Sequence, residues 1–452
     1  ALNKSFDKKY FLYLMGMGTG KTKVAIDNAV FLFNQGEIDT VFIVVPNSIT
    51  HNWLKEIDVD SSAKGFKYLF RRDSFDYHLK DHINWYVMNV EALSHASGVK
   101  VAKKLIDKHA DKMYLVVDEC TTIKNHKAKR TKNIIKLTSK VKYKRGMTGS
   151  PTAKSPLDLY TQCEFLDPYL LDFASYYAFR NRYAVMKTMH VRGRSIQVVH
   201  AFQNLAELSE KLQGFSYRVL KEDCLDLPEK VYIQREVELS DEQRQIYSTM
   251  KSAALAQLKG KMATAPHVLT QLMRLHQITC GHLKNDDDTI TEIKNNRMSE
   301  LLDVLDEVEG KVIIWANYVY DIKQIVKAIS KKYGEDSIVQ YYGAIPADVR
   351  QKNIEKFQDP KSDSRFFVGN PQTGGYGITL TAANNVIYYS NGYDLEKRLQ
   401  SEDRAHRIGQ KKSVTYVDFI TPKTVDEKIV KALRKKMNIA TEIMGEELRE
   451  WI

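Results

Sequence analysis

The sequence predicts an α/β fold in which two parallel-sheet lobes stand in tandem with helical insertions between them. Short runs of β-branched and aromatic residues alternate with longer helical patterns in both halves of the chain, as in βαβ units. Residues 155–310 are mostly helical in pattern. The length of 452 residues suits about two to four domains, each with a core of its own.

The strands of the first lobe are expected at 11–15, 40–45, 85–89, 113–117 and 144–148, and those of the second at 311–315, 338–341, 365–368, 386–389 and 414–420. Helices are expected at 23–33, 241–259 and 268–280. Pro228 interrupts a helical pattern and an extended run follows at 231–237, which predicts a boundary here. The first lobe then covers 1–226, with a helical and hairpin insertion. The second covers 227–452, with a helical insertion at about 240–310 and C-terminal helices.

The composition excludes several classes of protein. A hydrophobic share of 43% and an aromatic share of 10% are those of a globular chain. The longest apolar runs, at 41–45 and 115–117, are too short to cross a bilayer, and no leader indicates secretion, so a cytoplasmic protein is expected. The chain begins at Ala1 without Met, so residues are expected to be missing upstream. Widely spaced cysteines argue against disulfides and against a structural zinc site; they are Cys120, Cys163, Cys224 and Cys280.

The net charge of +12 is concentrated in one stretch. Residues 121–145 contain no acid and ten basic residues: Lys124, Lys127, Lys129, Arg130, Lys132, Lys136, Lys140, Lys142, Lys144 and Arg145. Such a stretch repels itself, and an external anion would relieve the repulsion. A phosphate-facing surface is therefore favoured over a solvated helix face, and Lys124, Lys127, Lys129 and Arg130 are the DNA-binding candidates.

A β-hairpin with a basic tip is predicted at 185–199. Two extended runs there flank Arg192, Gly193 and Arg194. Ordinary surface decoration is the favoured interpretation. The alternative is a wedge whose arginines, Arg192 and Arg194, touch DNA at a strand junction.

A phosphate loop is predicted between the first strand and the first helix. The segment reads Gly16-Met17-Gly18-Thr19-Gly20-Lys21-Thr22, with Met15 at the position where the strict motif has its first glycine. Glycines let backbone N–H groups approach a phosphate, and the helix N-terminus adds positive potential. Lys21 is expected to reach the β- and γ-phosphates, and the Thr22 hydroxyl to bind Mg²⁺.

Two carboxylates end the strand expected at 113–117. The carboxyl end of a parallel strand lies at the ligand-binding edge of its sheet. Asp118 is expected to hold Mg²⁺, and Glu119 to orient and deprotonate the attacking water.

A pair of arginines in the second lobe completes the set of candidate catalytic residues. Arg404 and Arg407 are three residues apart, so on a helix they would share a face and reach one phosphate group together. Solubilising surface arginines are the ordinary alternative. Because they lie in a different lobe from the phosphate loop, we favour the interpretation that they are arginine fingers, which complete the site when the lobes close.

Taken in order, these motifs resemble those of superfamily-two helicases, and among them the Swi/Snf-type DNA translocases, along almost the whole chain. The segments that carry the resemblance are Lys21-Thr22, Val45-Pro46 with Trp53 and Glu56, Asp118-Glu119 with Ile123-Lys124-Asn125, Thr148-Gly149-Ser150-Pro151, Leu227-Pro228-Glu229-Lys230, Gln243 with Tyr247, Tyr342-Gly343, Thr373 to Leu380 and Arg404 to Gln410. The ending Asp403 to Gln410 is the most specific. Cys120, Thr121, Thr373 and Thr379 depart from the family pattern.

The resemblance implies two RecA-like lobes with ATP and Mg²⁺ in the cleft between them. It implies ATP binding by Gly375 and Gly377 and coupling of hydrolysis to movement by Thr148, Gly149, Ser150 and Gln400. It adds Pro46, Asn47 and Thr379 to the DNA-binding candidates. The compact core is similar to phage or bacterial members, so the cytoplasm of a bacterium or infected host is expected, with association with the nucleoid in a bacterium.

The function expected from residues and resemblance together is that of an ATP-dependent DNA translocase or helicase. It would remodel or unwind forked or branched DNA, including branch migration, in replication, recombination or repair, as a monomer without a membrane partner. One alternative is a remodeller that tracks duplex DNA without separating strands. Another is a DNA-binding module gated by ATP with little turnover. An RNA helicase is disfavoured by the Swi/Snf-type motif at Asp403 to Gln410.

Overall fold

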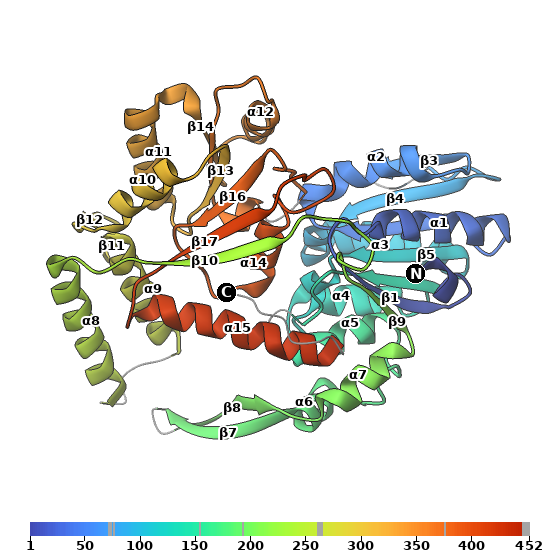
Figure 1. Ribbon diagram of the computed structural model, residues 1–452. Coiled ribbons are helices and arrows are strands. Elements are labelled where there is room, and N and C mark those ends of the chain that lie inside the picture. Colours follow the sequence, from blue (N-terminus) through green and yellow to red (C-terminus); the bar gives the residue numbers. More distant parts are fainter. Residues whose placement is uncertain are drawn as a thin grey trace. The chain divides into compact units, whose positions relative to one another are not determined.

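The computed structural model describes residues 1–70, 75, 77–152, 155–191, 194–259, 265–374 and 377–444. The chain forms two compact units (Figure 1). The first unit contains Ala1–Val185 and Val199–Asp226, together with a segment that begins at Asn438. The second unit contains Met186–Val198 and Leu227–Met437.

A seven-stranded parallel sheet forms the centre of the first unit, in the order β3-β4-β2-β5-β6-β1-β9. Its strands are β1 (Tyr10–Met15), β2 (Thr40–Val45), β3 (Gly65–Leu69), β4 (Ile83–Asn89), β5 (Met113–Asp118), β6 (Tyr143–Met147) and β9 (Ser216–Val219). The helices are α1 (Lys21–Asn34), α2 (Thr50–Asp60), α3 (Ala96–His109), α4 (Lys129–Thr138), α5 (Leu159–Leu166), α6 (Tyr176–Tyr183) and α7 (Leu205–Gln213).

The central strands of this sheet are buried on both faces, which is why they read as continuous hydrophobic runs. Every residue of β2 and of β5 is buried. The five strands expected in this half are present, with small differences at their ends. Two further strands, β3 and β9, were not predicted, because both are edge strands without a buried hydrophobic run.

The second unit contains a six-stranded parallel sheet in the order β10-β17-β16-β13-β15-β14. Its strands are β10 (Lys230–Glu236), β13 (Lys311–Trp315), β14 (Ile338–Tyr341), β15 (Phe366–Gly369), β16 (Ala383–Tyr388) and β17 (Val414–Ile420). The helices are α8 (Asp241–Lys259), α9 (Ala265–Cys280), α10 (Arg297–Glu307), α11 (Val319–Tyr333), α12 (Ala347–Gln358), α13 (Pro371–Gly374), α14 (Leu395–Glu402) and α15 (Val425–Met444), of which the residues from Asn438 on belong to the first unit. A separate small sheet pairs β11 (His282–Lys284) with β12 (Ile290–Glu292).

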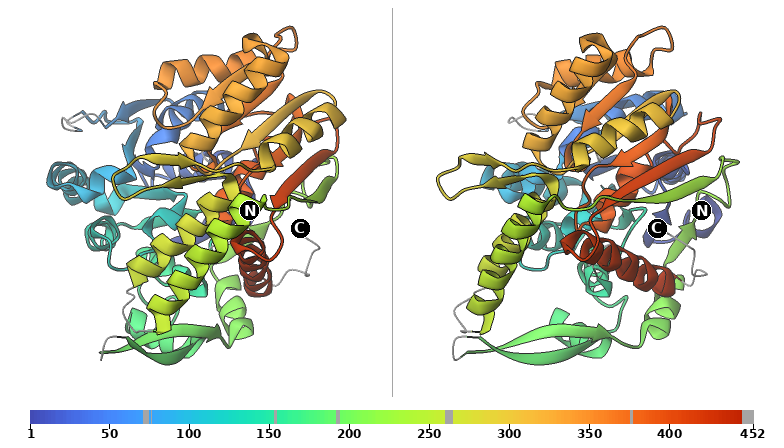
Figure 2. Two further views of the ribbon diagram at one scale, coloured as in Figure 1. Left: turned by 90° about the vertical axis from the view of Figure 1, so that its left-hand side faces the viewer. Right: turned by 60° about the vertical axis from the view of Figure 1, so that its left-hand side comes forward.

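Helices cover both faces of this second sheet (Figure 2). Val312 and Ile314 of β13 belong to one hydrophobic cluster with residues of α10 and α11. The alternate residues Ile313 and Trp315 belong to another cluster, with Phe357 of α12. Two tandem α/β units with parallel sheets confirm the predicted fold class.

The expected hairpin is present as β7 (Ala184–Val191) and β8 (Arg194–Phe202), which form a two-stranded sheet. Arg192 and Gly193 at its tip lie outside the described residues, and of Arg194 only the backbone, at the start of β8, is described.

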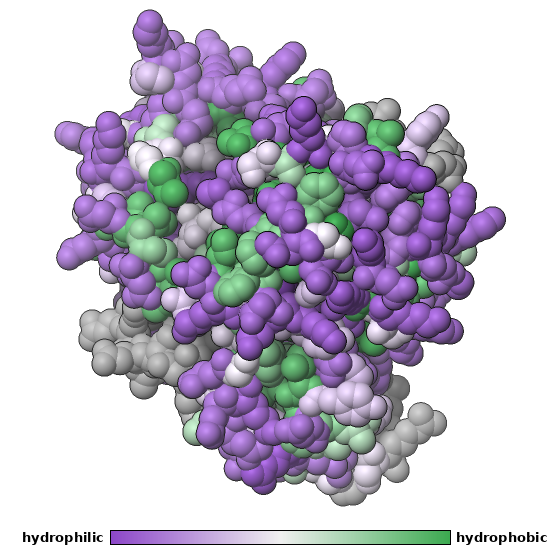
Figure 3. Space-filling view, turned by 90° about the vertical axis from the view of Figure 1, so that its right-hand side faces the viewer, coloured by the Kyte–Doolittle hydropathy of each residue, from purple (hydrophilic) through white to green (hydrophobic). Residues whose placement is uncertain are grey.

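One face of the molecule is dominated by hydrophilic residues, with smaller hydrophobic patches between them (Figure 3). In the described part of the chain, no helix combines the length and apolar character needed to span a bilayer.

Candidate nucleotide site and nucleic-acid interface

The predicted phosphate loop connects β1 to α1. Gly18 and Gly20 have φ of 79° and 84°, a left-handed conformation that favours glycine. A Cβ at either position would meet no atom within 4 Å, so the backbone here is open rather than crowded. Gly20 is the N-cap of α1, and the first turn of this helix contains no acid. The turn therefore leaves N–H groups and positive helix potential available to an anion.

The two polar residues that follow the loop lie beside other predicted motifs. Lys21 Nζ donates hydrogen bonds to the carbonyl oxygens of Met15 at 2.9 Å and Gly16 at 3.1 Å, so the ammonium group lies over the loop. The Thr22 hydroxyl is hydrogen-bonded to the Glu56 side chain on α2, and burial raises the pKa of the Glu56 carboxyl group.

Asp118, the last residue of β5, is brought to the phosphate loop by the parallel sheet. Its carboxylate accepts hydrogen bonds from Trp53 Nε1 at 2.9 Å and from the backbone N–H of Glu119 at 2.8 Å. Burial raises the pKa of Asp118, while the nearby charge of Lys21 and the Trp53 hydrogen bond act in the opposite direction. The phosphate loop, α2 and the end of β5 thus meet at one place within the first unit.

The backbone of Glu119 is in the left-handed region, with φ of 46°. This conformation is strained for a residue with a side chain and is common at functional sites. Its Oε2 accepts a long hydrogen bond, 3.5 Å, from Thr148 Oγ1, which also accepts the backbone N–H of Ser150 at 3.1 Å. The candidate base is therefore connected to the predicted coupling segment 148–150.

Gly149 packs closely against the phosphate loop. A Cβ at this position would lie 3.3 Å from the Met15 carbonyl oxygen. Arg218, on β9, donates from one terminal nitrogen to the Leu14 carbonyl at 3.2 Å and to the Gly149 carbonyl at 2.9 Å. Arg218 was not predicted as a site residue, because one arginine in a short edge strand has no sequence pattern that indicates a function.

Cys120, one of the departures from the family pattern, joins two motifs through Gln162. Its Sγ donates to Gln162 Oε1 at 3.1 Å, and Gln162 Nε2 donates to the carbonyls of Pro151 at 2.9 Å and Asp158 at 2.8 Å. Burial raises the pKa of the Cys120 thiol well above its usual value, so this link is between neutral groups.

The predicted arginine pair lies outside a helix, so the expectation that Arg404 and Arg407 share a helix face was wrong. Helix α14 ends at Glu402, and a turn carries both arginines. The two side chains nevertheless converge, because each donates to the carbonyl of Ile378, at 3.1 and 3.2 Å. Arg404 is fully buried and also donates to the Gln400 carbonyl at 2.8 Å, whereas Arg407 is partly exposed.

The other candidates of the second unit lie near this turn or in the segment before β16. Gln400 is buried on α14, and its amide donates to Glu396 Oε1 at 3.4 Å. Gly377 has φ of 73°, and Thr379 is half-buried. Gly375 lies outside the described residues.

Three of the ten basic residues in 121–145 do not belong to an anion-facing surface, which corrects the count made from the sequence. Lys142 forms an ion pair with Glu37 at 2.6 Å. Lys144 is buried, donates to the Phe165 carbonyl at 3.1 Å, and has a pKa lowered by burial to about 8. Arg145 is also fully buried.

The remaining basic residues form a narrower surface around α4. Lys127, Lys129, Lys132, Lys136 and Lys140 are exposed, and Lys124 and Arg130 are half-buried. Of the candidates from the segment after β2, Pro46 is buried and Asn47 is exposed, so only Asn47 presents a side chain to solvent.

The indole of Trp53 allows a test of the Asp118 environment. In Trp53→Phe, loss of the N–H donor is expected to raise the pKa of Asp118, because this hydrogen bond favours the carboxylate. If Asp118 binds Mg²⁺ and the chain hydrolyses ATP, as proposed below, the acid limb of the pH profile of turnover should move to higher pH, because only the ionised carboxylate binds the metal ion. Profiles of turnover against pH at a limiting Mg²⁺ concentration measure this shift. An unchanged acid limb would contradict the role of the indole.

Comparison with known proteins identifies the family. Residues 15–284 match the SNF2-related domain, and residues 293–409 match the helicase conserved C-terminal domain. The chain belongs to the SNF2-related family. The motifs described above lie within these two matches, apart from Gln410 at the end of the last one.

Named relatives of this SNF2-related chain are longer proteins. The putative ATP-dependent helicase/translocase YwqA of Bacillus subtilis is 26% identical over 456 residues, which cover 96% of this chain and 46% of the relative. The human SWI/SNF-related matrix-associated actin-dependent regulator of chromatin subfamily A member 1 is 28% identical over 94% of this chain and 40% of its own length. The chain thus spans less than half the length of these two relatives.

Among solved structures, a Sulfolobus solfataricus SWI2/SNF2 ATPase core in complex with dsDNA is 24% identical. It covers 96% of this chain and 88% of its own chain with a TM-score of 0.41.

Proposed function

We propose that this SNF2-related chain is a DNA-dependent ATPase that moves along DNA by hydrolysing ATP with residues from both units. The observation that carries the proposal is the meeting of Lys21, Thr22 and Asp118 at the carboxyl edge of the first sheet. The family match and the names of the relatives, which include ATP-dependent helicase/translocase, support the same activity.

The residues present fit ATP with Mg²⁺. The open backbone at Gly18 and Gly20 suits a phosphate group, and Lys21 adds a cation beside it. The Thr22 hydroxyl and the Asp118 carboxylate are the oxygen ligands that Mg²⁺ prefers. Bound Mg²⁺ would supply neutralisation of the phosphate charge. Glu119 would accept a proton from water, and Arg404 and Arg407 would stabilise charge on the transferred phosphoryl group.

We further propose that forked or branched DNA is the substrate and that the protein works as a monomer in replication, recombination or repair, including branch migration. The basic surface of α4 supports contact with DNA phosphates. Contacts to phosphates do not depend on the base sequence, so they suit a motor that must bind DNA equally well at every position along the strand.

ATPase and strand-displacement assays on matched single-stranded, duplex, forked and four-way DNA test this function. DNA-stimulated ATP hydrolysis is expected, with most displacement on forked or four-way DNA, and Lys21→Ala should abolish it. Hydrolysis stimulated by duplex without displacement would instead identify a duplex-tracking remodeller. DNA binding without turnover would identify an ATP-gated module, and stronger stimulation by RNA would identify an RNA helicase.

The basic surface of α4 gives a separate prediction on DNA affinity. Changing Lys127, Lys129, Arg130 and Lys132 to Gln is expected to flatten the dependence of log K on log salt by about 0.7–0.9 for each lost phosphate contact. Fluorescence anisotropy across a salt series measures this slope. The matched control changes four lysines of α3, Lys100, Lys103, Lys104 and Lys108, to Gln. An equal change in both variants would mean that only net charge matters.

A further inference from the structure

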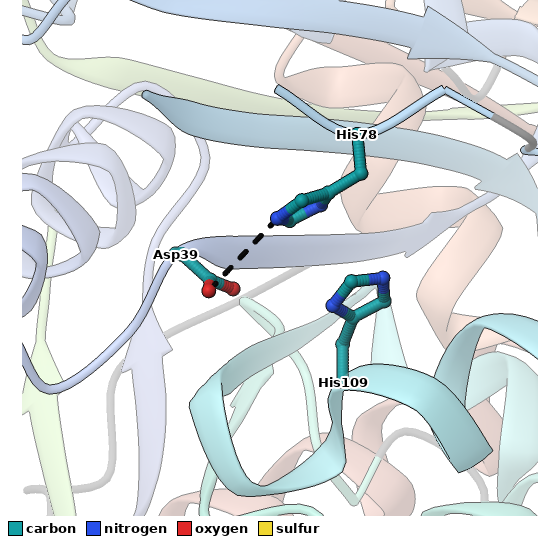
Figure 4. A group of neighbouring side chains, drawn as sticks. All are labelled: Asp39, His78 and His109. Carbon is teal, nitrogen blue, oxygen red and sulfur yellow. Dashed lines mark ion pairs between the residues drawn. The ribbon is translucent and has the colours of Figure 1, made fainter. Parts of the chain in front are cut away.

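Three potential metal ligands converge at the amino ends of the strands of the first sheet (Figure 4). The candidate nucleotide site lies at the opposite, carboxyl ends of these parallel strands. Asp39 directly precedes β2, and His109 is the last residue of α3. His78 lies in the segment before β4. Asp39 and His78 therefore lie near the amino ends of β2 and β4, whereas Asp118 lies at the carboxyl end of the parallel strand β5.

One ligand atom from each of the three side chains lies within 4.8 Å of the other two. His78 Nε2 is 3.9 Å from Asp39 Oδ2, and the rings of His78 and His109 are stacked with centroids 4.2 Å apart. All three residues are half-buried. The cluster is therefore partly shielded from water but open enough for a small ion to enter.

The hydrogen bonds around His78 determine which ring nitrogen carries a proton. Tyr86 donates its hydroxyl proton to the Tyr77 carbonyl at 2.6 Å, so in the 3.3 Å contact with His78 Nδ1 the Tyr86 oxygen must accept. A neutral His78 then carries its proton on Nδ1 and directs the lone pair of Nε2 at the Asp39 carboxylate. These two acceptors would be stabilised by a cation between them, either a proton on Nε2 or a metal ion.

The ligands also have supporting contacts of the kind found around metal sites. Tyr86 orients His78, and Thr40 Oγ1 donates to Asp39 Oδ1 at 2.7 Å, which leaves Asp39 Oδ2 facing the histidine. Outer contacts of this kind fix the tautomer and orientation of metal-binding histidines and carboxylates.

We propose that Asp39, His78 and His109 bind a divalent transition-metal ion of the Zn²⁺ class. Two imidazole nitrogens and one carboxylate oxygen form a set that Zn²⁺ accepts, with water as the fourth ligand. In tetrahedral coordination at about 2.0–2.1 Å, ligand atoms lie about 3.4 Å apart. Binding one ion therefore requires the stacked rings of His78 and His109 to turn so that a nitrogen of each points at the ion.

The ion would join three segments that are distant in the sequence: the start of β2, the segment before β4 and the end of α3. The cluster and the candidate nucleotide site lie at opposite ends of the strands of this sheet. The bound ion would therefore have a structural role, separate from ATP hydrolysis. The absence of paired cysteines argued against a structural zinc site in the sequence, but histidine and aspartate supply this one.

Metal titration of the untagged, chelator-treated full chain tests the proposal. Zn²⁺ followed by calorimetry and Co²⁺ followed by visible absorption should each show one ion per chain. His78→Ala, His109→Gln and Asp39→Asn should each remove this binding. Tyr86→Phe, which keeps the buried ring but loses the contact to His78, should weaken it by about 10–100-fold.

His82→Ala is the matched control, because His82 is a half-buried histidine of the same segment and lies outside the cluster. It should bind Zn²⁺ as the unmodified chain does. Circular dichroism checks that each variant is folded, and Zn²⁺ should raise the melting temperature of the unmodified chain but not of His109→Gln. No stoichiometric binding, or binding that persists in the His78 and His109 variants, would overturn the proposal.

Discussion

Arg407→Ala is expected to reduce ATP turnover by about 10³–10⁵-fold while DNA binding is retained. This range is what an arginine that stabilises the transferred phosphoryl group contributes to kcat. Arg407 is partly exposed, so its guanidinium can reach a ligand, and one nitrogen is held by the Ile378 carbonyl at 3.2 Å. Removing this side chain leaves no buried cavity, so the melting temperature should change little.

Arg404→Ala is the matched comparison, since both arginines donate to the same carbonyl oxygen. Arg404 is fully buried and also holds the Gln400 carbonyl. Its loss should lower the stability of the second unit as well as turnover. Steady-state ATPase, DNA affinity and thermal unfolding, measured on both variants, separate the two roles. Turnover within tenfold of the unmodified chain in Arg407→Ala would refute its assignment.

The parts of the fold that the sequence predicted have local signals. Buried parallel strands such as β2 and β5 are continuous hydrophobic runs, and the phosphate loop combines glycines with a strand before it and a helix after it. The edge strand β3 lacks such a run because most of it is exposed. A local pattern could not show that α14 ends at Glu402, because the motif continues through the following turn.

The contacts that complete the candidate site join residues distant in the sequence. Trp53 donates to Asp118 across 65 positions, and Arg218 reaches Gly149 across 69. Only the order of strands in the sheet brings such pairs together. For the same reason, Asp39, His78 and His109 gave no metal-site signal.

The burial of a charged side chain is a second property that could not be predicted from residue type alone. Arg145 was counted among the surface charges, yet it is fully buried on β6 and surrounded by carbonyl oxygens. Its guanidinium donates to Asn28 Oδ1 and to the carbonyls of Ser5, Lys8, Lys9 and Lys144, at 2.8–3.0 Å. These bonds use all the N–H donors that an arginine has and tie the N-terminal segment to the strand beside β1.

Arg145→Met is therefore expected to lower the free energy of unfolding of the first unit by about 3–5 kcal/mol. A buried acceptor left without a donor costs about 1–3 kcal/mol, and several are affected here. Denaturant unfolding followed by hydrogen exchange resolves the two units, and the second unit should be unchanged. The control Lys142→Met removes a surface ion pair with Glu37 and a contact with the Tyr143 ring, and a loss of about 0–1 kcal/mol is expected for the ion pair.

Arg145→Lys should recover only part of this stability. A lysine keeps the charge but has three donors at one point, so it cannot reach all the acceptors that surround the edge of the guanidinium group. Because β6 pairs directly with β1, loosening the N-terminal segment should also increase exchange at Tyr10–Met15, the strand that ends at the phosphate loop. A lysine variant as stable as the unmodified chain would show that charge, rather than the set of directed hydrogen bonds, holds this segment.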